Sequence, residues 1–193
     1  MVTDTQLLEQ AAALHEEANR LLIAEGLLPI ITTAGPARVY GSFELDLMTW
    51  RDIDINLQLA NPHDVATMFT VGQSIATRFE ANRMFYSNHF IRNDQSFDHG
   101  LYWGMRLRYA GALWKVDLWA YGEEAYRAHM QSFDELQQQL ATADRIAILR
   151  IKDAFCRRSE YRDTVCSMDI YRAVMEHNIS TVEGFEAWLR LRS

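Results

Sequence analysis

Residues 39–42 read VYGS and residues 52–59 read DIDINLQL, and this stretch decides the fold. In the second run apolar residues alternate with polar ones, the period of two that is typical of a β-strand. The first run ends in a glycine, which permits a sharp chain reversal. We therefore predict a strand, a turn or short helix, and a second strand between Arg38 and Gln58.

The second of these strands carries two acidic residues, Asp52 and Asp54. Residues two apart in a strand point to the same face, so the two carboxylates project together. Like charges this close disfavour one another unless a cation holds them or one takes a proton. Oxygen ligands at this spacing suit Mg²⁺, which typically keeps waters and substrate phosphates among its ligands. The alternative is a solvated polar face of an edge strand.

A third carboxylate, Asp117, lies in the strongly strand-forming run from Leu113 to Trp119. If this strand neighbours the one that carries Asp52 and Asp54, the three carboxylates form a platform for two metal ions. Two-metal sites of this kind support in-line attack on phosphorus.

Helical patterns flank this region. Apolar residues recur at helical spacing over residues 7–22, which predicts a first helix that is stopped by Gly26 with Pro29. Pro62 suits the first position of a second helix, which we expect to run to about Asn82.

The remainder of the chain changes in texture near Gly122. Aromatic and branched residues predict strands between Phe85 and Tyr121, two of which look like a hairpin at about 101–109 and 112–121. Beyond Gly122 we predict helices at about 123–140, 143–158, 167–177 and 181–191. The expected fold is therefore α+β, with a mixed twisted sheet flanked by helices. We expect an α+β core over residues 1–122 and a helical C-terminal region over residues 123–193 packed on that core.

Composition limits the partners. No apolar run approaches the roughly 20 residues of a membrane-spanning helix, and the N-terminus lacks a signal-peptide pattern, so we expect a cytoplasmic protein without a membrane partner. The net charge of -7 gives no general attraction to phosphate backbones, so a long nucleic acid is not an expected partner. The sequence does not indicate the oligomeric state.

The order of these motifs resembles the signature of the polymerase-β-like nucleotidyltransferases, including the minimal and antibiotic-modifying types. The resemblance rests on Gly41-Ser42, on the pair Asp52 and Asp54 after nine intervening residues, and on the distant Asp117. It implies that the three aspartates bind two Mg²⁺ ions, that Asp117 is a possible general base, and that Gly41 and Ser42 hold the triphosphate of a nucleoside triphosphate.

The sequence departs from the commoner pattern of that superfamily after Ser42. Many relatives have an arginine a few residues later, whereas residues 43–50 of this chain read FELDLMTW. Many also have a small hydroxyl residue directly before the first aspartate, where this chain has Arg51. Phosphate contacts are therefore assigned to Arg51 or to the helical region, where Lys152 and Arg145 fall on one face of a predicted helix.

The resemblance implies a metal-dependent enzyme that moves a nucleoside monophosphate from a nucleoside triphosphate to a hydroxyl of a small molecule or protein, with pyrophosphate leaving. A second interpretation stays open, in which the chain is a catalytically silent, nucleotidyltransferase-like binding module, for example one component of a toxin–antitoxin pair. The sequence indicates neither the acceptor nor the nucleotide, whether ATP, GTP or CTP.

Overall fold

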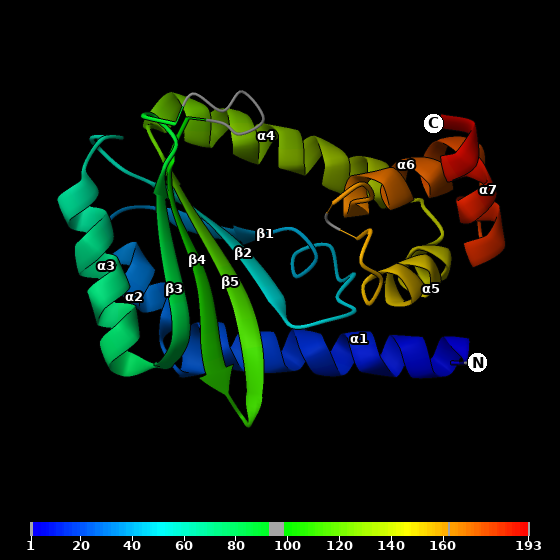
Figure 1. Ribbon diagram of the computed structural model, residues 1–193, viewed down its shortest axis with the longest axis horizontal. Helices are drawn as coiled ribbons and strands as arrows, with labels where there is room; N and C mark the ends of the chain where they lie inside the picture. The colour runs from blue at the N-terminus through cyan, green and yellow to red at the C-terminus, as the bar shows by residue number, and fades with distance from the viewer. Residues whose placement is uncertain (1, 93–98, 162, 193) are drawn as a thin grey trace. The chain divides into compact units, whose positions relative to one another are not determined.

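The computed structural model describes residues 2–92, 99–161 and 163–192. It has an α+β fold in which helices flank a five-stranded mixed sheet, so the predicted fold class is confirmed (Figure 1). Two compact units make up the chain: a sheet unit, Glu16–Leu45 and Arg51–Phe133, and a helical unit of Asp46–Trp50 with the residues up to His15 and from Asp134 onward. The core boundary predicted after residue 122 stays a prediction.

The sheet has the order β1-β2-β5-β4-β3. Strand β2 pairs in parallel with β5, whereas the other three pairings are antiparallel. The strands are β1 (Ala37–Tyr40), β2 (Asp52–Gln58), β3 (Glu80–Asn88), β4 (Leu101–Tyr109) and β5 (Ala112–Tyr121). The central parallel pair brings together strands that lie far apart in the sequence.

The predicted hairpin is confirmed at its predicted residues, 101–109 and 112–121. Its two-residue turn has positive φ at Ala110 and Gly111, 49° and 77°, the backbone that matches the twist of hairpin strands. Residues 93–98 of the segment that was predicted as strand lie outside the described residues.

One face of the sheet packs against helices of the same unit. Helix α3 (Val65–Arg78) contacts β3 and β4, and the indole nitrogen of Trp103 donates to the Met68 carbonyl at 2.9 Å. Helix α2 (Leu27–Thr32) contacts β1. The side chains buried on this face alternate along the strands: Val39, Ile53, Ile55, Leu57, Leu101, Trp103, Met105, Leu107, Trp114, Val116 and Leu118. The polar residues between them therefore face away from the core.

Three helix boundaries differ from prediction. Helix α1 (Asp4–Asn19) continues as a π-helical turn, η1 (Arg20–Ala24), and Gly26 reverses the chain at φ 88°. Pro29 lies inside the first turn of α2, where its missing N–H costs nothing, instead of ending a helix. Helix α3 begins at Val65 and not at Pro62, because the side chain of Asp64 caps it by accepting from the Thr67 amide. It stops at Arg78, short of the expected Asn82, because Glu80 already pairs with β4.

The C-terminal helices agree closely with the predicted ranges. They are α4 (Glu123–Leu140), α5 (Arg145–Phe155), α6 (Ser167–His177) and α7 (Val182–Arg192). In the helical unit the rings of Phe155 and Phe185 pack edge to face, 4.9 Å apart. Among the described residues, no helix has the length and apolar character needed to cross a membrane.

Candidate functional site

The parallel pairing of β2 with β5 brings the predicted carboxylates onto one face of the sheet. Asp54 lies directly opposite Asp117, and Asp52 lies opposite Lys115. The three aspartates are all partly exposed. The apolar residues next to them in each strand are fully buried: Ile53 and Ile55 in β2, and Val116 and Leu118 in β5. All three carboxylates therefore project from the face that does not carry the apolar core.

The ammonium group of Lys115 lies between two of these carboxylates. Its Nζ donates to Asp52 Oδ1 at 2.9 Å and to Asp117 Oδ2 at 2.6 Å, and the three side chains are only 15–17% exposed. Burial by itself lowers the pKa of Lys115, but the charges of Asp52, Asp117 and Asp54 outweigh it and the pKa is raised. One positive charge therefore already offsets part of the negative charge of the three carboxylates.

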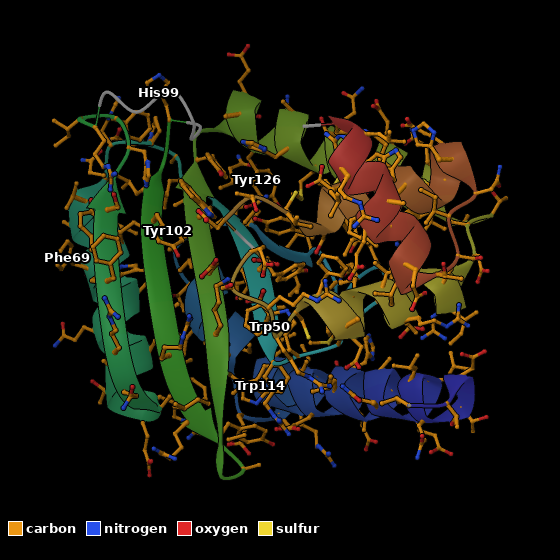
Figure 2. All side chains as sticks on the ribbon, turned by 45° about the vertical axis from the view of Figure 1, so that its right-hand side comes forward. Trp50, Phe69, His99, Tyr102, Trp114 and Tyr126 are labelled. Carbon is orange, nitrogen blue, oxygen red and sulfur yellow. The ribbon has the colours of Figure 1, made fainter. Side chains whose placement is uncertain are left out.

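Tyr102 projects from β4 (Figure 2) and holds the other oxygen of Asp117. Its hydroxyl donates to Asp117 Oδ1 at 3.0 Å. The residue opposite Asp117 on β4 is Gly104, where an added Cβ would lie 2.5 Å from the Tyr102 hydroxyl oxygen. Glycine at this position therefore leaves the space through which the phenol reaches Asp117. Burial and then the charge of Asp117 raise the pKa of Tyr102.

Gly41 lies against Asp54 on the β1 side of β2. It follows β1, has φ 70°, and its carbonyl accepts from the Leu45 amide at 3.1 Å in a tight turn that also contains Ser42. A Cβ at Gly41 would lie 2.6 Å from Asp54 Oδ2. Only glycine allows the backbone to come this close to the carboxylate in this conformation. The turn and the carboxylates therefore form one site.

The two predicted cationic residues have partners elsewhere. The Arg51 guanidinium forms a bidentate pair with Glu17 on α1, at 3.1 and 2.9 Å, and the Trp114 indole donates to the same carboxylate. Lys152 belongs to the helical unit and is completely buried there. Its amine donates to the Leu47 carbonyl at 2.8 Å. A phosphate-binding role for Arg51 and for Lys152 stays a prediction, which these contacts disfavour.

The donor set fits a hard divalent cation in its chemistry, although the described residues contain no ready-made cluster of three acidic, histidine or cysteine ligands. Three carboxylates share one face, and the ammonium of Lys115 is a stand-in cation between Asp52 and Asp117. Carboxylate oxygens are the ligands that Mg²⁺ prefers. A metal ion that takes Asp52 Oδ1 or Asp117 Oδ2 as a ligand would therefore compete with Lys115.

Sequence reasoning missed Lys115 and Tyr102. The signal for Lys115 was present, since it lies two residues before Asp117 on the same strand and must share its face. Tyr102 had no such signal, because its approach to Asp117 depends on the pairing of β4 with β5 and on the gap at Gly104.

No protein-family model matches the sequence, and no curated protein matches it. The chain is similar to the solved Cid1 poly(U) polymerase with Mg and 3′-dATP bound, at 15% identity and a TM-score of 0.47 over 88% of this chain and 48% of that chain. It is also similar to the non-canonical poly(A) polymerase complex GLD-2–GLD-3, at 15% identity and a TM-score of 0.48 over 86% and 56%.

One neighbour is a poly(U) polymerase and the other contains a poly(A) polymerase. The chain spans about half the length of these solved structures. Because the similarity is this distant, we infer a function from the geometry around Asp52, Asp54 and Asp117 alone.

Proposed function

We propose that the protein is a metal-dependent nucleotidyltransferase that moves a nucleoside monophosphate from a nucleoside triphosphate to an acceptor hydroxyl. The observation that carries the proposal is the register of β2 and β5, which sets Asp54 opposite Asp117 with Gly41 against Asp54. The presence of all three carboxylates on one face weighs against the alternative of a catalytically silent binding module.

Asp52, Asp54 and Asp117 would hold Mg²⁺, which when bound neutralises the charge that develops on the phosphates. The backbone of the Gly41-Ser42 turn would cradle the triphosphate beside Asp54, since amides of a tight turn are good phosphate donors. Asp117 would take the proton of the acceptor hydroxyl. The oxygen of that hydroxyl would bond to the α-phosphorus while the bond to the leaving pyrophosphate breaks. In this chemistry the protein contributes mainly position and charge neutralisation.

The test of the proposal is incubation with each α-labelled nucleoside triphosphate and Mg²⁺ against a panel of acceptors. The panel includes small hydroxyl compounds, proteins and RNA, because the acceptor is not assigned by the carboxylate geometry. We expect release of pyrophosphate and transfer of label with at least one acceptor. Absence of both for every triphosphate, with the protein folded, would refute the proposal.

Lys115 gives a test of the metal site that does not depend on turnover. Replacing it by Met removes two charge-assisted hydrogen bonds from the carboxylates and should lower the stability of the metal-free protein by about 2 kcal/mol. Because the carboxylates then repel one another, added Mg²⁺ or Mn²⁺ should raise the melting temperature of Lys115→Met more than that of the wild type.

The matched control for this measurement is Arg78→Met, which removes an exposed cation that pairs with Glu25 in the same unit. We expect its metal-induced shift to equal that of the wild type. Equal shifts in Lys115→Met and the wild type would show that Lys115 and the metal do not share ligands.

A further inference from the structure

A row of cations crosses the open face of the sheet beside the carboxylates. Lys115 on β5 lies opposite Asp52 on β2 and, on its other side, opposite Arg106 on β4. Arg106 in turn lies opposite Arg83 on β3. Residues directly opposite in a sheet share a face, so all four side chains lie on the face that carries Asp117. Lys115 is engaged by the carboxylates, and the two arginines extend the row to the edge strand.

A β-bulge turns Arg83 onto this face. Ala81 pairs with Leu107 and Arg83 pairs with Arg106, so Asn82 is an extra residue in β3. If β3 paired regularly, without a bulge, Asn82 would lie opposite Arg106, and Arg83 would point to the core side. Bulges next to active sites characteristically re-aim a side chain.

Neither arginine has a carboxylate partner among the described residues. Arg106 donates to the carbonyl of Met105, at 3.2 Å, and Arg83 is exposed. Like charges directly opposite on neighbouring strands are destabilising. The nearby Arg108, in contrast, pairs with Glu80 at 3.5 Å. An unbalanced arginine pair on a protein of net charge -7 is therefore a feature that an anion would stabilise.

Arg83 and Arg106 offer two guanidinium groups, which is enough to bind one anionic group and not a series of them. Arg108, the next residue of β4 on this face, pairs with Glu80 and so does not extend the row. The other sheet-unit arginines that pair with carboxylates lie outside the row: Arg20, Arg51, Arg78 and Arg127. Two adjacent guanidinium groups match the oxygens of one phosphate. A long polynucleotide would require an extended basic surface.

The pair also lies on the acceptor side of the carboxylates. Gly41 flanks Asp54 on the β1 side, whereas Arg106 and Arg83 lie on the β4 and β3 side, with α-carbons roughly 8 Å and 12 Å from that of Asp117 by strand geometry. In-line displacement brings the acceptor from the side opposite the leaving pyrophosphate. The arginines are therefore placed for the acceptor and not for the donor.

An exposed ring completes this surface. Phe85 lies opposite Gly104 on the same face, and it is 48% exposed, which is high for an aromatic residue in a sheet. A planar or apolar part of a ligand can pack against it while a phosphate reaches the arginines.

We infer that Arg83 and Arg106 bind the phosphate of a small phosphorylated acceptor whose ring or apolar part packs on Phe85. That this ligand is an acceptor rests on the proposed function, but the binding site itself does not require turnover. The acceptor's free hydroxyl would then point toward Asp117.

The test measures binding of phenyl phosphate and of phenol without divalent cations, by calorimetry or competition. The wild type should bind phenyl phosphate about tenfold more tightly than phenol, and the double variant R83A/R106A should lose that preference. The affinity for ATP with Mg²⁺ should be unchanged in R83A/R106A. Removal of the like-charge pair should leave the melting temperature equal or higher, so loss of folding does not explain the result.

The matched control R78A/R127A removes two paired, exposed arginines from the same unit and should keep the preference for phenyl phosphate. An unchanged preference in R83A/R106A would overturn the inference. A loss of ATP affinity in R83A/R106A equal to its loss of phenyl phosphate affinity would assign the pair to the donor nucleotide instead. If a single-stranded oligonucleotide that lacks a terminal phosphate binds more tightly than phenyl phosphate, and R83A/R106A loses that binding, the pair belongs to a polynucleotide site. If no acceptor is ever modified but the preference depends on the pair, the proposed function fails and this site stands.

Discussion

Replacing Asp54 by Asn is expected to reduce nucleotidyl transfer by on the order of 10³-fold or more, because a metal ligand supplies several kcal/mol of charge stabilisation in the transition state. Asp54 is opposite Asp117 in the sheet and is the carboxylate against which Gly41 lies. It is thus the residue that both the metal and the triphosphate should meet.

The same substitution should leave the fold intact. Asn keeps the shape of the side chain, and it removes one charge from a cluster of like charges in the metal-free protein. The measurements are turnover with the labelled triphosphates and thermal unfolding with and without Mg²⁺. We expect an unchanged melting temperature without metal and a smaller increase with it.

The control variant is Glu25→Gln, which removes an exposed carboxylate that pairs with Arg78 in the same unit and should keep full turnover. Full turnover in Asp54→Asn would remove Asp54 from the mechanism. Loss of turnover together with a collapsed melting temperature would show a structural role instead.

Local patterns predicted the elements of this fold but not their neighbours. The hairpin at 101–121 and the four C-terminal helices follow from turn residues and from periodicity, both of which are properties of short segments. Helix α3 shows the limit, because the helical pattern continues past Arg78 whereas the pairing of Glu80 with β4 ends the helix. Pairing across the sheet outweighs local preference there.

The carboxylates could be named from the sequence, but their convergence could not be derived from it. Asp54 and Asp117 meet only because β2 and β5 pair in parallel, and no local pattern specifies which strands pair. For the same reason the bulge that turns Arg83 beside Arg106 was not predictable, since it exists only relative to its partner strand.

Lys152 is the residue for which sequence and structure point to different outcomes. As a phosphate ligand on an open helix face, its truncation would raise the Michaelis constant for the nucleotide with little effect on stability. In the structure the side chain is fully buried, and its amine donates to the Leu47 carbonyl at 2.8 Å and to the Tyr171 hydroxyl at 3.2 Å.

The Leu47 carbonyl belongs to a segment that several side chains hold by its backbone. Arg145 of α5 donates to the Asp46 carbonyl at 3.0 Å, and Gln10 of α1 donates to the Thr49 carbonyl at 3.1 Å. Lys152 thus contributes the central one of these contacts within the helical unit.

We therefore expect Lys152→Ala to destabilise the protein by about 3 kcal/mol or more, because it leaves a cavity and an unsatisfied buried carbonyl. For a chain of this size that is a fall in melting temperature of roughly 6–12 °C. Lys152→Met should cost less, since it keeps most of the volume and removes a buried charge. Thermal unfolding of both variants, with nucleotide kinetics at a temperature where both are folded, separates the two roles. Unchanged stability of Lys152→Ala together with a raised Michaelis constant would instead make Lys152 the phosphate ligand.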